Sequence, residues 1–183
     1  MTLPNLITIA RLLSVPGIVY FVIADQYLLA SVLFILAGIS DGVDGFIARQ
    51  FDMKSDLGGY LDPLADKALL TSVYIVLTYK GLLPVWLAVL VVSRDILIVG
   101  AVMLSWMVGK PVEMAPLMVS KANTTAQIAL AGLVLCSAAL IFDPGRLLGV
   151  IIVLTGALTV ISAVAYITDW LRHMSEINGH KAG

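Results

Sequence analysis

Four aspartates lie within two apolar stretches in the first half of the chain: Asp41 and Asp44 in one, Asp62 and Asp66 in the next. An Asp at the centre of a membrane helix costs about 3 kcal/mol to insert, so four unpaired ones would cost on the order of 10 kcal/mol. Few cations stand nearby, which makes bound metal ions the natural compensating charge. Two divalent ions held by carboxylates indicate phosphoryl or diphosphate chemistry.

The spacing of the surrounding residues predicts two helix faces. Residues at i, i+3, i+4, i+7 and i+8 share one face, and residues at i, i+4 and i+8 share a face of the following helix. The first set is Asp41, Asp44, Gly45, Ala48 and Arg49, and the second is Gly58, Asp62 and Asp66. We expect residues 50–57 to form a tight connection that brings both faces together as an oxygen-rich site for Mg²⁺ or Mn²⁺.

Two other interpretations of the four acids remain open. They could be structural carboxylates, two of them paired with Arg49 and Lys67. They could also line an ion path or proton relay, because acids within membrane helices often mark such paths.

The composition predicts an integral membrane protein. The 183 residues are 60% hydrophobic and 13% charged, with a mean hydropathy of +1.02, whereas soluble domains carry about 25% charged residues. We expect one domain, 1–183. The net charge of −1 argues against nucleic acid as a partner, and the single cysteine, Cys136, excludes an intrachain disulfide.

Six segments are long and apolar enough to cross a bilayer, so we expect an all-α fold with six transmembrane helices. They cover about 7–24, 27–48, 57–79, 83–108, 117–142 and 147–171, without a cleavable signal peptide at the start. With both termini in the cytoplasm, the inner side collects Arg11, Arg49, Lys54, Lys110, Arg172 and Lys181, and the outer side only Lys80 and Arg146. The active-site cavity would then face the cytoplasm of a bacterial inner membrane or its equivalent.

The residues from Asp41 to Asp66 resemble a family signature. The pattern D-x2-D-G-x2-A-R-x8-G-x3-D-x3-D is that of the CDP-alcohol phosphotransferases, and every fixed position is met. Six spans with cytoplasmic termini agree with that family, so the resemblance covers most of the chain. Its members are commonly homodimers.

The resemblance implies a metal-dependent phosphatidyltransferase. Two divalent ions, Mg²⁺ or Mn²⁺, would bind the diphosphate of CDP-diacylglycerol through Asp41, Asp44 and Asp62, with Asp66 as a further ligand or the general base. The acceptor hydroxyl would attack the β-phosphorus and release CMP. The residues expected around the CDP moiety are Gly45, Ala48, Arg49 and Gly58, to which we add Asn5 and Thr8 at the start of the first span.

Other polar residues within the spans are candidates for binding the acceptor. Arg94 and Lys121 suit a phosphate, and we add Arg11 and Asn123. For Arg94 the alternative is a structural pair with Asp95 or another carboxylate.

The sequence around and beyond the signature positions resembles most closely that of the cardiolipin synthases of this family, in stretches such as LDPLADKALL and SKANTTAQ. We therefore expect phosphatidylglycerol as the acceptor and cardiolipin as the product. The alternative is glycerol 3-phosphate, giving phosphatidylglycerophosphate. For that branch we would expect a Glu at position 95 and a GKxKT-like run, where this chain has Asp95 and SKANT. A membrane prenyltransferase and a divalent-ion transporter are the rivals from other classes. Metal-dependent CMP release would separate the enzyme from both.

Overall fold

The computed structural model describes residues 3–50, 56–107 and 118–179. Within these ranges it leaves out the side chains of 3–7, 41–50, 56–64, 102, 104–107 and 172–179. The described residues form six α-helices and no strand, which confirms the all-α prediction. The helices are α1 (Leu3–Ile23), α2 (Tyr27–Gln50), α3 (Asp56–Tyr79), α4 (Val85–Met107), α5 (Met118–Leu140) and α6 (Arg146–Gly179).

Most helix boundaries agree with the predicted segments to within a few residues. The largest difference is at α6, which continues as helix to Gly179 rather than ending near residue 171. Residues 172–178 contain no Gly or Pro, so nothing in their backbone chemistry ends the helix before Gly179. The predicted polar tail is therefore largely helical.

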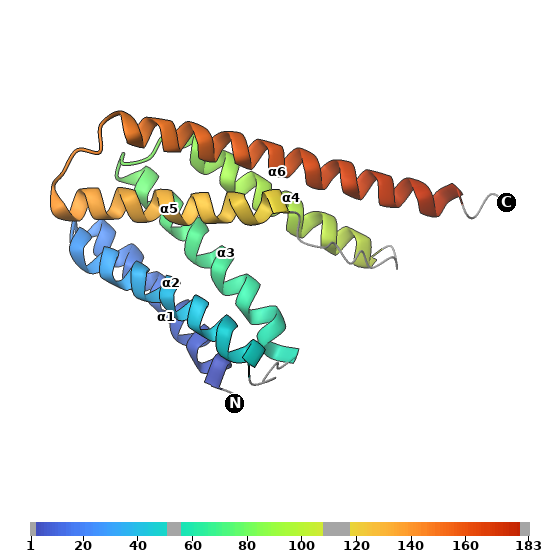
Figure 1. The fold of residues 1–183 in the computed structure, drawn as a ribbon, viewed down its shortest axis with the longest axis horizontal. Coiled ribbons are helices and arrows are strands. Elements are labelled where there is room, and N and C mark those ends of the chain that lie inside the picture. The colour runs from blue at the N-terminus through green and yellow to red at the C-terminus, as the bar shows by residue number, and fades with distance from the viewer. Residues whose placement is uncertain (1–2, 51–55, 108–117, 180–183) are drawn as a thin grey trace.

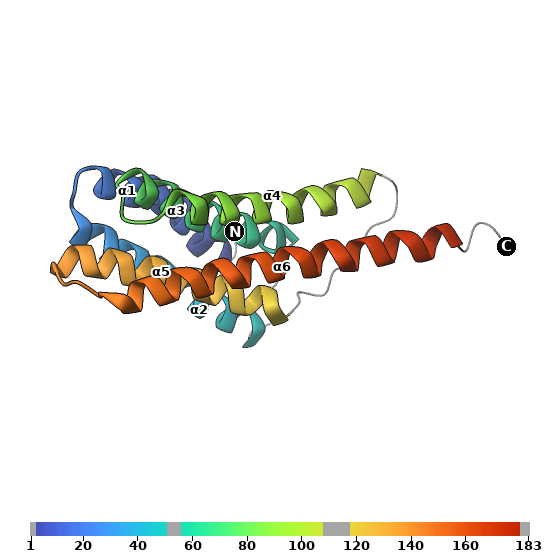
Figure 2. The ribbon, with the colours of Figure 1, turned by 90° about the horizontal axis from the view of Figure 1, so that it is seen from above.

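The helices lie in two layers that converge at one end of the molecule. Figure 2 shows α1, α3 and α4 in one layer and α2, α5 and α6 in the other. The turns after α1, α3 and α5 gather at the left of Figure 1, and from there the helices spread apart toward the other end. In the described residues α1 packs on both α2 and α3, and α6 packs on α4 and α5.

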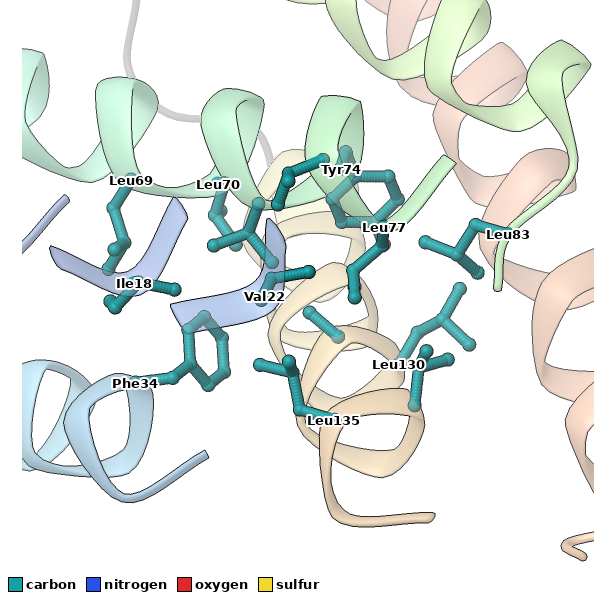
Figure 3. Packing of buried hydrophobic residues seen from close by; sticks show 14 of the residues in the cluster. Ile18, Val22, Phe34, Leu69, Leu70, Tyr74, Leu77, Leu83, Leu130 and Leu135 are labelled. Carbon is teal, nitrogen blue, oxygen red and sulfur yellow. The ribbon is translucent and has the colours of Figure 1, made fainter. Parts of the chain in front are cut away.

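The hydrophobic core lies where α1, α2, α3 and α5 meet. Ile18, Phe34, Leu77 and Leu130 come from these four helices and are buried together (Figure 3). Tyr74 is the largest fully buried side chain among the described residues. Its hydroxyl donates a hydrogen bond to the backbone carbonyl of Gln127 at 3.2 Å. This contact satisfies the buried phenol and joins α3 to α5.

Backbone chemistry ends α1 and α3 at the convergent end. Gly81 has a φ of 73° after α3, and the Leu82 N–H donates to the Leu77 carbonyl at 2.9 Å. This is the left-handed termination that glycine favours. Asp25, after α1, also has a positive φ, and its Oδ1 lies 2.5 Å from Lys80 Nζ. The ion pair joins the α1 and α3 turns, and its hydrogen bond lowers the pKa of the Asp25 carboxyl.

The outer surface of the bundle is apolar. Two helical segments among the described residues are long and apolar enough to cross a bilayer, Met118–Leu140 and Arg146–Leu171, and Thr8–Ile23 and Tyr27–Ser40 are shorter apolar helices. Large hydrophobic side chains face outward on every helix, for example Leu13, Leu36, Ile75, Ile96, Ile128 and Val153. An extensive exposed apolar surface of this kind is unusual for a soluble monomer.

Candidate active site

The motif residues fall on the two helices that the spacing predicted. Asp41, Asp44, Gly45, Ala48 and Arg49 belong to the C-terminal half of α2, and Gly58, Asp62 and Asp66 to the N-terminal half of α3. Only the Asp66 side chain is among those that the structure describes, so the predicted contacts of the other seven residues lie outside it. The described part of the chain accordingly contains no group of three or more potential metal-ligating side chains.

Asp66 forms an ion pair with the first helix. Arg11 Nη1 donates to Asp66 Oδ1 at 2.8 Å, across 55 residues of sequence. The Arg11 side chain is fully buried, whereas that of Asp66 is 43% exposed. Asp66 therefore has one edge fixed by a guanidinium while much of its surface stays accessible. This contact was not anticipated from the sequence, which placed Arg11 with the acceptor.

A cavity of about 520 Å³, lined largely by charged and polar residues, lies beside Asp66. Its lining comes from α3, α4, α5 and α6 and includes Lys67, Arg94, Lys121 and Tyr166. The volume is within the range of about 300–1,000 Å³ that is typical of small-molecule sites. Neither Lys67 nor Lys121 forms an ion pair with a described residue. Cationic groups thus face a space that also contains the Asp66 carboxylate.

Arg94 ties three helices together at the wall of this cavity. Its Nη1 donates to Asp95 Oδ1 at 2.6 Å, and its Nη2 donates to Ser162 Oγ of α6 at 2.9 Å and to Ser120 Oγ of α5. The guanidinium carbon lies 5.8 Å from the centre of the Tyr166 ring. The alternative interpretation of Arg94, a pair with Asp95, is confirmed, and its predicted contact with the acceptor stays a prediction.

The remaining predicted residues lie at different distances from this cavity. Lys121 is exposed and lines it, whereas Asn123 is buried between α5 and α6, where its Oδ1 accepts a hydrogen bond from Thr159 at 2.9 Å. Thr8 is buried on α1, one turn before Arg11, and the Asn5 side chain lies outside the described residues. Of these residues, Lys121 therefore agrees best with the predicted acceptor role, because it lines the same cavity as Asp66.

Gln127 is one of the polar residues of the fifth predicted span that the sequence offers for binding the acceptor. It is 1% exposed and lines the cavity, and its Nε2 has no hydrogen-bond partner among the described residues. A buried amide donor without a partner is costly, so this nitrogen is an energetically unfavourable feature of the cavity wall. The sequence feature that points to Gln127 is a polar residue on an apolar helix, two turns after Ser120 and on the same helix face.

An apolar groove meets the cavity on its α2 side. It has a volume of about 400 Å³ and is lined mainly by hydrophobic residues of α2, α3 and α5, with Gly38 and Gly132 at its walls. The groove and the cavity share Asp66, Leu70 and Thr124. A molecule with a polar head and an apolar tail could therefore place its head near Asp66 and its tail between α2 and α5.

The chain is similar to a family of lipid-synthesising transferases and to several of its named members. The model of the family described as CDP-alcohol phosphatidyltransferase matches residues 1–162. The chain is 38% identical over 180 residues to a protein of Schizosaccharomyces pombe named cardiolipin synthase (CMP-forming) / mitochondrial hydrolase fusion protein, covering 90% of this chain and 30% of that protein. It is 34% identical over 185 residues to a probable cardiolipin synthase (CMP-forming) of Drosophila melanogaster, covering 92% and 58%.

A Bacillus subtilis protein is matched over more of its own length. It is named CDP-diacylglycerol–glycerol-3-phosphate 3-phosphatidyltransferase and is 32% identical over 141 residues, which is 69% of this chain and 72% of that protein. The chain spans less than two thirds of the yeast and fly proteins.

Proposed function

This chain belongs to the CDP-alcohol phosphatidyltransferase family, and on that premise we propose that it transfers the phosphatidyl group of CDP-diacylglycerol to an alcohol acceptor and releases CMP. The proposed acceptor is phosphatidylglycerol and the product cardiolipin, a choice supported by the names of the yeast and fly relatives. The Bacillus relative supports the second candidate, glycerol 3-phosphate as acceptor.

The proposed setting is a membrane that the chain crosses six times, as one domain with both termini in the cytoplasm. The outward-facing hydrophobic side chains on all six helices support this placement, because a bilayer would cover them. The charged turn of Asp25 and Lys80 would then lie on the outer side, and the opening near Lys121 on the cytoplasmic side. A homodimer is part of the proposal and rests on the resemblance to the family.

The residues proposed to hold two divalent ions, Mg²⁺ or Mn²⁺, are Asp41, Asp44, Asp62 and Asp66. Four carboxylates are a hard oxygen donor set that suits these ions. The described member, Asp66, fits this role because its side chain is partly exposed and borders both the cavity and the α2–α5 groove. Bound there, the ions would neutralise the diphosphate and stabilise the leaving CMP.

The donor is proposed to lie along the α2 side of Asp66. Its acyl chain would occupy the groove between α2 and α5, and its CDP moiety would lie toward Gly45, Ala48, Arg49 and Gly58, with Asn5 and Thr8 at the start of α1. The continuity of the groove with the Asp66 cavity supports this arrangement.

The proposed reaction is a substitution at the β-phosphorus of the donor. The acceptor hydroxyl oxygen forms a new bond to this phosphorus, the bond to the bridging oxygen breaks, and CMP leaves with the electron pair. Asp66 accepts the hydroxyl proton. Arg11 holds the Asp66 carboxylate in place through the 2.8 Å contact, which makes Arg11 a positioning residue in this scheme.

The cavity beside Asp66 is the main support for the proposed acceptor site. Its lining brings Lys67 and Lys121 together with Asp66, and Gln127 is also among the lining residues. The acceptor's phosphate would contact Lys121, with Lys67, Arg94 and Gln127 around it. Because Arg94 already donates to Asp95, Ser120 and Ser162, we assign the main phosphate contact to Lys121.

An acceptor panel tests the proposal. The purified protein would be given CDP-diacylglycerol with Mg²⁺ or Mn²⁺ and either phosphatidylglycerol or glycerol 3-phosphate, and CMP and lipid products would be measured. We expect cardiolipin from phosphatidylglycerol. Formation of phosphatidylglycerophosphate alone would select the second candidate, and no CMP release with any alcohol would refute the transferase.

A single substitution tests the acceptor contact. Lys121→Ala should raise the acceptor KM by about tenfold, the usual scale for one charge-assisted contact, and leave the KM for CDP-diacylglycerol unchanged. Lys80→Ala is the matched control, because Lys80 lies in the turn after α3 and lines no part of the cavity. An equal rise in both KM values would contradict a contact with the acceptor alone.

A further inference from the structure

A second apolar groove lies between α4 and α6, next to the cavity beside Asp66. It has a volume of about 530 Å³, and its walls include Gly100 and Ala101 of α4 and Ala163 of α6. The groove and the cavity share Ile98 and Tyr166. The cavity beside Asp66 therefore borders an apolar groove on its α4–α6 side as well as on its α2 side.

This groove opens to the outside of the bundle. Ile96, Leu97 and Ile167 line it and are 65%, 50% and 42% exposed. In the proposed setting these side chains would face lipid, so a chain of the bilayer could enter the groove from the side without crossing a polar surface.

We propose that this groove holds an acyl chain of the acceptor, and that the acceptor is therefore a glycerophospholipid rather than a soluble phosphorylated alcohol. This inference rests on the proposed function and specifies the substrate class of the same site. Lys67 and Lys121 provide cationic charge in the cavity, and the adjoining groove has an apolar lining. That sequence of surfaces complements an anionic head group joined to a hydrocarbon tail.

In this proposal the donor lipid and the acceptor lipid each have a separate apolar groove for an acyl chain. The groove between α2 and α5 borders Asp66 itself and Arg11, whereas the groove between α4 and α6 reaches the cavity through Ile98 and Tyr166. Glycerol 3-phosphate has no apolar part that would occupy the second groove. Burial of methylene groups there would stabilise only an acceptor with acyl chains.

Gly100 allows the groove to be filled without disturbing its neighbours. A Cβ built at Gly100 has no atom within 4 Å, so Gly100→Leu would project into open space. The same is true of Gly149 on α6, which does not line the groove, so Gly149→Leu is the matched control. Gly38→Leu, which lines the groove between α2 and α5, is the contrasting variant.

The experiment compares two acceptors in detergent micelles, dioleoyl- and dihexanoyl-phosphatidylglycerol, with CDP-diacylglycerol as the donor. Gly100→Leu should lower the ratio of kcat/KM for the long-chain to the short-chain acceptor by about tenfold, which corresponds to about two buried methylene groups. The KM for CDP-diacylglycerol should not change. Gly149→Leu should leave both quantities at their wild-type values, and Gly38→Leu should raise the KM for CDP-diacylglycerol.

Three results would overturn the inference. An unchanged ratio in Gly100→Leu, with cardiolipin still formed, would remove the groove assignment and leave the proposed function standing. An equal loss for both acceptors, with a smaller particle mass by light scattering, would make the groove a contact between two copies of the chain. If the wild-type protein formed no cardiolipin from either acceptor, the acceptor assignment itself would fall, and the groove assignment with it.

Discussion

The Arg94–Asp95 pair offers a sharp test of how much a compensated buried charge at the cavity wall stabilises the protein. The two side chains are 6% and 11% exposed, and Arg94 also donates to Ser120 of α5 and Ser162 of α6. Asp95→Ala would remove the only negative charge that the described residues place against this guanidinium. The variant would keep the protein's length and helix propensity, since Ala favours helices.

The expected cost follows from the burial of the pair. Removing one partner of a buried ion pair destabilises a protein by about 3–5 kcal/mol, because the other charge is left uncompensated. Arg94 would keep its hydrogen bonds to the two serines, so we take the lower end, about 3 kcal/mol. For a chain of this size that corresponds to a fall in Tm of about 6–12 °C.

Thermal unfolding in detergent, followed by tryptophan fluorescence, would measure this loss. Asp169→Ala is the matched control, because Asp169 is an exposed carboxylate on α6. The double variant Arg94→Met with Asp95→Leu removes both charges, so it should recover at least half of the lost stability. If Asp95→Ala unfolds at the same temperature as Asp169→Ala, the buried ion pair does not stabilise the protein.

Three further predictions concern packing, pH and metal. Gly156→Val should destabilise the protein by about 1–3 kcal/mol, since overpacking is costly and a Cβ at Gly156 would lie 2.7 Å from a ring carbon of Trp86; Gly149→Val, which meets nothing, should unfold like the wild type. Lys80 lowers the pKa of Asp25 below its usual value of 3.8, so the carboxylate adds stability above that pH and loses it as the pH falls through the lowered pKa. The difference in Tm between the wild type and Asp25→Asn should therefore be present at neutral pH and shrink below pH 3.8; a constant difference would contradict the role of this charge. Excess chelator should abolish CMP release and Mg²⁺ or Mn²⁺ should restore it, whereas full activity in chelator would refute the two-ion proposal.

Local sequence carries the helices and the motif. Each helix follows from an apolar run of about 20 residues, and each end at the convergent side from a residue such as Gly81 that accepts a positive φ. The assignment of Asp41–Ala48 to one helix and Gly58–Asp66 to the next needed only the helical period. These features depend on residues that are neighbours in sequence, which is why they could be predicted.

Only the tertiary structure shows which polar side chains on different helices contact one another. The contact of Arg11 with Asp66 spans 55 residues, and the hydrogen bond from Arg94 to Ser162 spans 68. Neither spacing carries a period, because the rotation and crossing of packed helices determine which polar side chains meet. The acceptor residues were accordingly the weakest part of the sequence reasoning.

The same reason explains the cavities. Lys121 could be recognised as a candidate from its type, but only the packing of α3, α4, α5 and α6 shows that it faces the same space as Asp66 and that Asn123 lies between α5 and α6 instead. The sequence by itself determined an apolar helical chain with four aspartates at helical spacing on two consecutive helices. The shape of the space beside that motif, with an apolar groove on each side, exists only once the helices are packed.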